Sequence, residues 1–180
     1  MHRNSAFTPK NMAYISLFTA LLCVLSPLAI TLPISPVPFT LGTFVLYITI
    51  YIIGLRRGLI SFLLYLLLGF VGLPVFAGFT SGPARLLGPT GGYLFGELFL
   101  ILVLGLLIKK SYLLGLILGT IICYLLGTLW LAGLNQLSFI SALSLGVLPY
   151  LPFDAIKILG AFLLAPRIRS RLIKAKLLSL

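Results

Sequence analysis

Long apolar runs make up most of this 180-residue chain, and prolines, glycines or pairs of basic residues interrupt them. Only 8% of the residues are charged, whereas a soluble domain carries roughly 25%. The chain therefore has too little polar surface to cover a water-soluble globule. A helix needs about 20 apolar residues to cross the hydrocarbon of a bilayer. These features predict an all-α integral membrane protein, with residues 1–180 forming a single membrane domain.

The apolar runs predict a bundle of six transmembrane helices. We expect the spans at residues 12–31, 40–55, 58–73, 91–108, 112–132 and 151–166. Pro27 lies inside the first span and could kink it, and the last span is expected to stop at Pro166. Residues 32–39 hold three prolines and no charge, which predicts an extended loop. The basic tail 167–180 could lie on the membrane surface.

The basic residues predict the orientation of the bundle, because cytoplasmic loops carry an excess of lysine and arginine. With the N-terminus inside and six crossings, eleven of the 13 basic residues fall on one side. They are Arg3, Lys10, Arg56, Arg57, Lys109, Lys110, Arg167, Arg169, Arg171, Lys174 and Lys176. Both termini are thus expected in the cytoplasm of a multi-pass protein of the cell membrane. Loop topology and anionic lipid account for the net charge of +11, so nucleic acid is not indicated as a partner.

Four charged residues remain outside this pattern: Arg85, Glu97, Asp154 and Lys157. The topology places all four in the outer half of the bundle, where ionisable groups usually face a cavity or a partner. Asp154 and Lys157 are spaced i, i+3 and share one helix face. They could form an internal ion pair, a polar clamp for a ligand, or both. Glu97 could form an ion pair with Lys157 across the bundle or face a water-filled outer mouth, and we expect the ion pair.

Residues 72–97 form a glycine- and proline-rich interruption between the third and fourth spans. Gly91 and Gly92 open a helix, whose free N–H groups attract an anion or an acceptor. Without side chains they also let a ligand approach the backbone, and Tyr93 offers an aromatic wall. The alternative is a tight turn with close helix packing. The stretch lacks the GxxxxGK[ST] pattern of a phosphate-binding loop, so we expect no nucleotide hydrolysis in this chain.

Catalytic and metal-binding patterns are absent from the sequence. Ser81 has no histidine to activate it, because the one histidine is His2 at the terminus. Cys23 and Cys123 are too far apart for a metal-binding motif and fit as packing residues. We therefore expect no enzyme, no catalytic residue, no metal site and no cofactor held by this chain.

Three motifs closely resemble the BioY family of biotin transporters, the substrate-binding S components of energy-coupling factor (ECF) transporters. They are GLPVFAG (72–78), LLGPTGGYLFG (86–96) and FDAIKILGAFLLAPRIRSRL (153–172). PVPFTLGTF (36–44) and LRRG (55–58) extend the resemblance over essentially the whole chain. The resemblance implies a six-helix bundle that captures biotin from the outside with high affinity. It also implies that the first and third outer loops cover the site.

Biotin has a ureido ring, a thioether ring and a valerate carboxylate. The resemblance implies that Asp154 and Lys157 hold the ureido end, and that Arg85 meets the carboxylate or a covering loop. The remaining candidates line the ring pocket or open the second span: Gly91, Gly92, Tyr93, Thr40 and Thr43.

The resemblance also implies partner proteins, namely a transmembrane coupling subunit and two ATPase subunits that use ATP. Family members often dock through small residues four apart on the first span, which here are Ser16 and Ala20 rather than an alanine pair. Phe79 and Glu97 also depart from the family pattern. The alternative function is a stand-alone, ion-coupled transporter of a small carboxylate, with Asp154 or Glu97 as the proton carrier. A membrane enzyme would need a nucleophile and a base that the sequence lacks.

Overall fold

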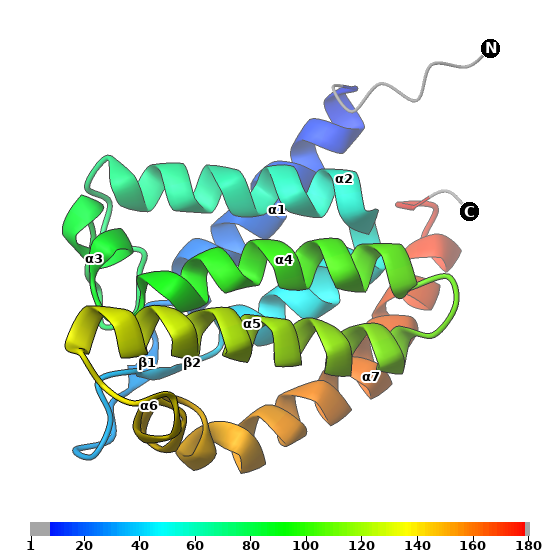
Figure 1. Ribbon diagram of the computed structural model, residues 1–180. Coiled ribbons are helices and arrows are strands. Elements are labelled where there is room, and N and C mark those ends of the chain that lie inside the picture. Colours follow the sequence, from blue (N-terminus) through cyan, green and yellow to red (C-terminus); the bar gives the residue numbers. More distant parts are fainter. Residues whose placement is uncertain (1–7, 179–180) are drawn as a thin grey trace.

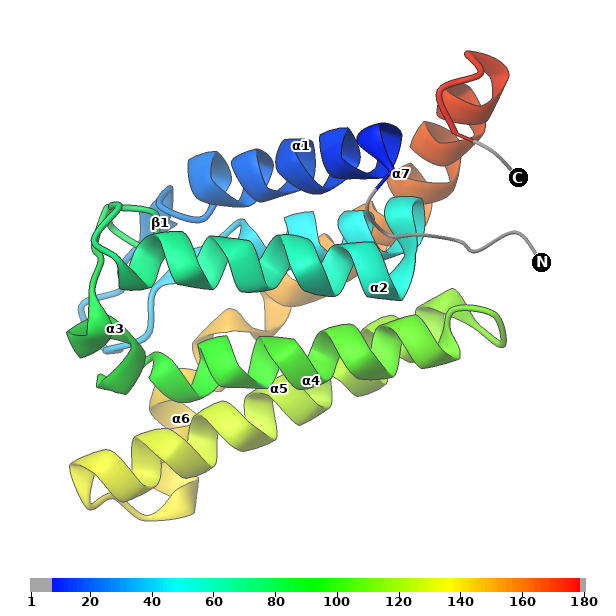
Figure 2. The same cartoon turned by 90° about the horizontal axis from the view of Figure 1, so that it is seen from above.

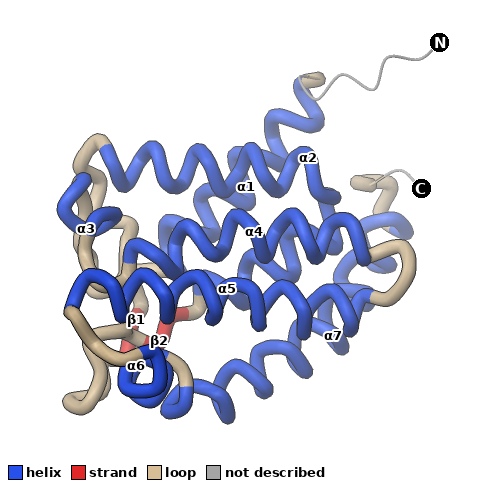
Figure 3. The backbone as a smooth tube through the Cα atoms, in the orientation of Figure 1, coloured by secondary structure: helices blue, strands red, loops and turns tan. Residues whose placement is uncertain are grey.

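The computed structural model describes residues 8–178, which form a mostly helical bundle (Figure 1). Arg3 therefore lies outside the described residues. The helices are α1 (Pro9–Leu25), α2 (Gly42–Phe70), α3 (Pro83–Leu87), α4 (Gly91–Leu107), α5 (Tyr112–Asn135), α6 (Phe139–Gly146) and α7 (Leu151–Lys174), and the 3-10 turn η1 (Leu148–Tyr150) precedes α7. Two short strands, β1 (Ala29–Ile30) and β2 (Phe39–Thr40), pair antiparallel with Ala29 opposite Thr40 (Figure 3). The proline-rich segment between them is not helical, as its sequence predicts.

Helix α2 consists of two arms that meet at a reversal of the chain. Gly54 has φ +81° and ψ 169° there, a conformation that glycine adopts readily because it lacks a Cβ. The arms run in opposite directions beside each other (Figures 1 and 2). They pack so closely that a Cβ on Gly58 would lie 2.3 Å from Cδ1 of Ile50. The expected runs 40–55 and 58–73 thus correspond to the two arms of one bent element.

Helices α4 and α5 form the most extensive helix pair of the bundle. Small residues four apart allow the two backbones to approach closely, as in many membrane helix pairs. A Cβ on Gly96 of α4 would lie 3.0 Å from Cα of Cys123, and a Cβ on Gly119 of α5 would lie 3.2 Å from the carbonyl oxygen of Leu100. This close packing fixes the start of α4 against the second half of α5.

Two helix boundaries differ from those that the prolines predict. Helix α1 ends at Leu25 with Ser26 as its C-cap, so Pro27 lies beyond the helix and does not kink it. Helix α7 continues through Pro166 to Lys174 instead of stopping there. A proline inside a helix removes one backbone hydrogen bond, and neighbouring helices can compensate for that loss. Here Ala165 is fully buried, which holds the turn around Pro166 in the packed bundle.

The loops at the left-hand end of the bundle in Figure 1 contain more helix than the sequence predicts. The glycine-rich stretch folds into α3 just before α4, and the stretch after Asn135 folds into α6 and η1. Both lie at the same end of the bundle as the β1–β2 pair (Figure 1). These elements close that end of the bundle.

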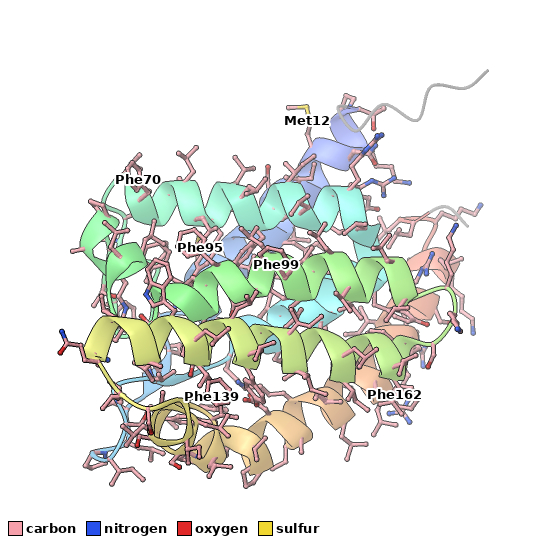
Figure 4. All side chains as sticks on the ribbon, in the orientation of Figure 1. Met12, Phe70, Phe95, Phe99, Phe139 and Phe162 are labelled. Carbon is pink, nitrogen blue, oxygen red and sulfur yellow. The ribbon has the colours of Figure 1, made fainter. Side chains whose placement is uncertain are left out.

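The exterior of the bundle is apolar. Within residues 8–178, three helical stretches are long and apolar enough to cross a membrane, namely Gly42–Phe70, Tyr112–Asn135 and Phe139–Lys174. Large apolar side chains on several helices are 38–52% exposed, and Figure 4 labels Met12, Phe70, Phe95, Phe99, Phe139 and Phe162. Exposed apolar surface of this extent is typical of a surface that contacts lipid. The fold is therefore that of a helical membrane protein.

The basic residues gather at one end of the bundle. Four segments lie at the right-hand end in Figure 1: the start of α1, the reversal of α2, the α4–α5 turn and the end of α7. These segments carry Lys10, Arg56, Arg57, Lys109, Lys110, Arg167, Arg169, Arg171, Lys174 and Lys176. The α3, β1–β2 and α6 elements lie at the other end, where the chain has far fewer cations.

Candidate functional site

A cavity lies at the end of the bundle that α3, the strands and α6 close. The first turns of α2, α4 and α7 form its walls together with the second half of α5. Its polar lining side chains are Ser26, Thr40, Thr43, Tyr65, Arg85, Thr90, Tyr93, Glu97, Tyr124, Tyr150, Asp154 and Lys157. All four charges that the membrane topology leaves unexplained thus line one cavity, which confirms that they converge.

Asp154 and Lys157 form an ion pair on the first turns of α7. Lys157 is 7% exposed, and its Nζ lies 2.7 Å from Oδ1 of Asp154. The same ammonium donates to Oγ1 of Thr43 at 3.1 Å and lies 4.1 Å from the ring centroid of Phe39. The i, i+3 spacing predicts this pair. Contacts from α2 and β2 then fix the ammonium at the cavity wall.

Tyr124 of α5 holds the second oxygen of Asp154. Its hydroxyl donates to Oδ2 of Asp154, so both carboxylate oxygens have a donor within the protein. Tyr124 also lines the cavity. The sequence alone does not identify Tyr124 as a site residue, because a tyrosine in an apolar helix is usually a packing residue and its sequence neighbours do not distinguish it.

Glu97 lines the same cavity from α4 but has no such partners. Among residues 8–178 its carboxylate forms neither an ion pair nor a hydrogen bond. The expected ion pair with Lys157 is therefore wrong. Asp154 is the partner of Lys157 instead, because one turn of α7 brings the two side chains together without any contact between helices.

Arg85 reaches the cavity from α3 and is half-buried. Burial lowers the pKa of its guanidinium, although an arginine in a protein keeps its charge. No carboxylate in the described part of the chain pairs with it. The cavity therefore offers one cation that is free to meet an anionic group of a ligand.

The glycines at the start of α4 do not line the cavity. A Cβ on Gly91 would lie 1.8 Å from the carbonyl oxygen of Leu86, and one on Gly92 would lie 2.1 Å from Cβ of Trp130. Their small size thus serves packing against α3 and α5, the alternative reading of this motif. Tyr93 does line the cavity, with its ring against the glycines of α5 and α6.

Several uncharged lining residues lie outside the sequence-based site. Thr90 is 7% exposed and its Oγ1 has no hydrogen-bond partner among the described residues. Phe39 contacts Phe153 with ring centroids 5.3 Å apart, and the hydroxyl of Tyr150 donates to the carbonyl of Val37. This last bond ties the proline-rich loop to the start of α7. The loop therefore forms part of the cavity wall.

These side chains provide the means to bind an organic molecule rather than to transform it. Aromatic rings suit an apolar body, the carboxylates accept from N–H groups, and the cations meet carbonyl or carboxylate oxygens. No cluster of three or more possible metal ligands occurs in residues 8–178. Thr40 and Thr43 also line this cavity. Of the eight substrate-binding candidates from the sequence, six therefore meet around it.

The two residues proposed for partner docking lie on α1. Ser16 and Ala20 are both exposed, one helical turn apart. Exposed apolar residues surround them, including Leu17 and Val24. This face of α1 is thus available to another helix or to lipid.

Comparison with known proteins gives consistent matches over nearly the whole chain. Residues 1–174 match the BioY family. The biotin transporter BioY of Thermotoga maritima is 40% identical over 158 residues, which cover 85% of this chain and 92% of that protein. The probable biotin transporter BioY of Pyrococcus horikoshii is 37% identical over 160 residues, covering 89% and 96%. A crystal structure of the S-component for biotin from an ECF-type ABC transporter matches with a TM-score of 0.83 at 29% identity, covering 94% of this chain and 95% of that chain.

Proposed function

This chain belongs to the BioY family, and on that premise we propose that its cavity captures biotin as the substrate-binding component of an ECF-type uptake system. It is a multi-pass protein of the plasma membrane and a transporter rather than an enzyme. The observation that carries the proposal is the cavity itself. It brings a buried Asp154–Lys157 pair and the unpaired cation Arg85 to one site at the end of the bundle with few cations.

The residues of the cavity match the parts of biotin. The ureido ring has two N–H donors and one carbonyl acceptor, which a carboxylate and an ammonium can satisfy together. We assign this end to Asp154 and Lys157, with Thr40 and Thr43 beside them. The valerate carboxylate requires a cation, and Arg85 is the unpaired one. Tyr93 and Phe39 offer rings to the apolar bicycle.

We further assign six membrane spans and a cytoplasmic location for both termini. The two arms of α2 count as separate spans in this assignment, and α1, α4, α5 and α7 supply the others. The ten described cations at the right-hand end in Figure 1 support this orientation, since lysine and arginine are enriched in cytoplasmic loops. The cavity then opens toward the outside, where biotin is captured.

The partners that fit this function are a transmembrane coupling subunit and two ATPase subunits. The sequence lacks the GxxxxGK[ST] pattern of a phosphate-binding loop, so we assign ATP hydrolysis to those subunits. Ser16 and Ala20 offer small side chains one turn apart on an exposed face of α1. Such spacing permits close approach of a second helix, and we propose this face as the docking surface.

A binding titration tests the proposal. We expect the purified protein to bind biotin saturably at one site per chain, and Arg85→Gln to weaken that binding by about tenfold, as loss of a charge-assisted contact would. Lys110→Gln removes the same charge at the basic end and serves as the matched control. Absence of saturable binding, or equal weakening by both variants, would contradict the proposal.

Uptake measurements separate this function from ion-coupled transport. In vesicles that contain only this protein, an ion-coupled transporter would accumulate biotin until the proton gradient is collapsed. We expect accumulation to require the coupling subunit and the ATPases instead. Gradient-driven accumulation without them would favour the stand-alone mechanism.

A further inference from the structure

The chain has two acidic side chains, Glu97 and Asp154, and both line the same cavity. They differ in whether the protein donates hydrogen bonds to them. Asp154 receives Lys157 on one oxygen and the hydroxyl of Tyr124 on the other. Glu97 receives no donor from any residue of the described chain. A carboxylate can accept about four hydrogen bonds. Glu97 is therefore a carboxylate whose full accepting capacity is available to a ligand, whereas Asp154 already uses about half of its own.

An unpaired carboxylate within a membrane helix is unfavourable, so such groups usually face a cavity and act on a ligand. The neighbouring charges do not remove this cost. Lys157 and Asp154 both act on Glu97 electrostatically, and Lys157 is held by Asp154 and Thr43. Tyr65 of α2, Cys123 and Tyr124 of α5 and Arg85 of α3 line the cavity as well. None of these donates a hydrogen bond to Glu97.

We propose that Glu97 determines ligand specificity, because its carboxylate accepts an N–H group from the ring end of the ligand beside the Asp154–Lys157 pair. The inference rests on the proposed function and adds a residue to the ring end of that site. The ureido group offers two N–H donors. Tyr124 and Lys157 already occupy one position on each oxygen of Asp154. Of the two carboxylates that line the cavity, Glu97 is the one without a donor among the described residues, and it can accept the second N–H.

Glu97 also affects which ligand charge the site accepts. The Asp154–Lys157 pair has no net charge. In a pocket built from this pair alone, the Lys157 ammonium would repel a cationic ring, and the pair would offer the ring no net attraction. A cationic ring favours the ionised form of Glu97, and with Glu97 ionised the three-residue set is net negative. In 2-iminobiotin a guanidine replaces the ureido group and is a cation at neutral pH. The wild-type site should accept this analogue because of Glu97.

The test compares biotin with 2-iminobiotin at neutral pH in the wild type, Glu97→Gln and Glu97→Met. Gln keeps an acceptor but loses the charge. We expect Glu97→Gln to weaken the binding of biotin about threefold to tenfold. The loss for 2-iminobiotin should be at least about tenfold larger than the loss for biotin, because charge-assisted hydrogen bonds are the stronger kind. Met loses the acceptor as well, and we expect it to weaken both ligands more than Gln does. Lys110→Gln at the basic end should leave the affinity ratio unchanged.

The ratio of the affinities for biotin and 2-iminobiotin is independent of the fraction of protein that is folded. Moderate instability of a variant therefore does not change the measured ratio. Both variants remove a partly exposed carboxylate on a membrane helix that accepts no hydrogen bond from the described residues. We expect both to unfold at no lower temperature than the wild type. An unchanged affinity ratio in both variants, with biotin still bound by the wild type, would overturn the role of Glu97 alone. A wild type that binds no biotin would overturn the proposed function and this inference together.

Discussion

The Asp154–Lys157 pair makes a quantitative prediction for the substitution Asp154→Asn. Both side chains are largely buried, with exposed fractions of 13% and 8%. Removing one member of a buried ion pair usually costs about 3–5 kcal/mol, because the other charge is left unpaired. Lys157 would keep its contacts with Thr43 and with the ring of Phe39, and a cation–π contact contributes roughly 0.5–2 kcal/mol. We therefore expect a loss near the lower limit, about 3 kcal/mol of unfolding free energy.

A second substitution separates stability from binding. Adding Lys157→Met to Asp154→Asn removes the unpaired charge, and replacing a buried pair with neutral groups is often neutral or stabilising. The double variant should thus regain the stability of the wild type to within about 1 kcal/mol. Biotin binding should stay weaker by about 1–3 kcal/mol, or roughly 5- to 150-fold, because polar groups of the ligand lose their partners.

The two quantities are measured separately on the same four proteins: the wild type, both single variants and the double variant. Chemical unfolding in detergent gives the stability, and calorimetric titration with biotin gives the affinity. A double variant that binds biotin like the wild type would show that the pair serves stability only. A single Asp154→Asn variant as stable as the wild type would show that the ion pair is not buried as described.

Two further predictions address the other end of the ligand and the helix packing. Arg85→Gln should leave the affinity for biotinol, which lacks the carboxylate, within about twofold of the wild-type value, since the substitution removes a contact to a carboxylate. Equal losses of affinity for biotin and biotinol would exclude Arg85 as the carboxylate partner. Gly92→Ala should destabilise the bundle by about 1–3 kcal/mol through overpacking, because its Cβ would lie 2.1 Å from a tryptophan of α5. Gly133→Ala lies on the same helix pair, where a Cβ meets nothing within 4 Å, and should stabilise the bundle by about 0.5–1 kcal/mol. Equal effects of the two substitutions on thermal unfolding would contradict the packing described.

The charged part of the site is predictable from the sequence, because charges are scarce in this chain. Arg85, Glu97, Asp154 and Lys157 stand out once topology accounts for the other cations. The i, i+3 spacing also predicts the ion pair on α7. Uncharged lining residues such as Tyr124 cannot be recognised in the same way, since such residues also occur in apolar helices as ordinary packing groups.

Where the structure differs from the sequence-based expectations, the physical causes lie in contacts that the local sequence does not contain. Glycine at positions 91 and 92 indicates that something approaches the backbone closely, but not whether it is a ligand or, as here, a neighbouring helix. Pro166 favours a helix end locally, yet packing around the buried Ala165 carries α7 past it. Glu97 could be matched to Lys157 by charge alone. The i, i+3 spacing offers Asp154 to Lys157 as well, and the structure shows that Lys157 pairs with Asp154.

A structure of the protein with biotin bound would test the assignment of the site. We predict that the ureido carbonyl oxygen lies about 2.7–3.2 Å from Nζ of Lys157, the normal range for such a hydrogen bond. The ureido N–H groups should face Asp154 and Glu97, and the valerate carboxylate should lie beside Arg85. Biotin bound outside this cavity, or in the reverse direction with its carboxylate at Lys157, would contradict the assignment.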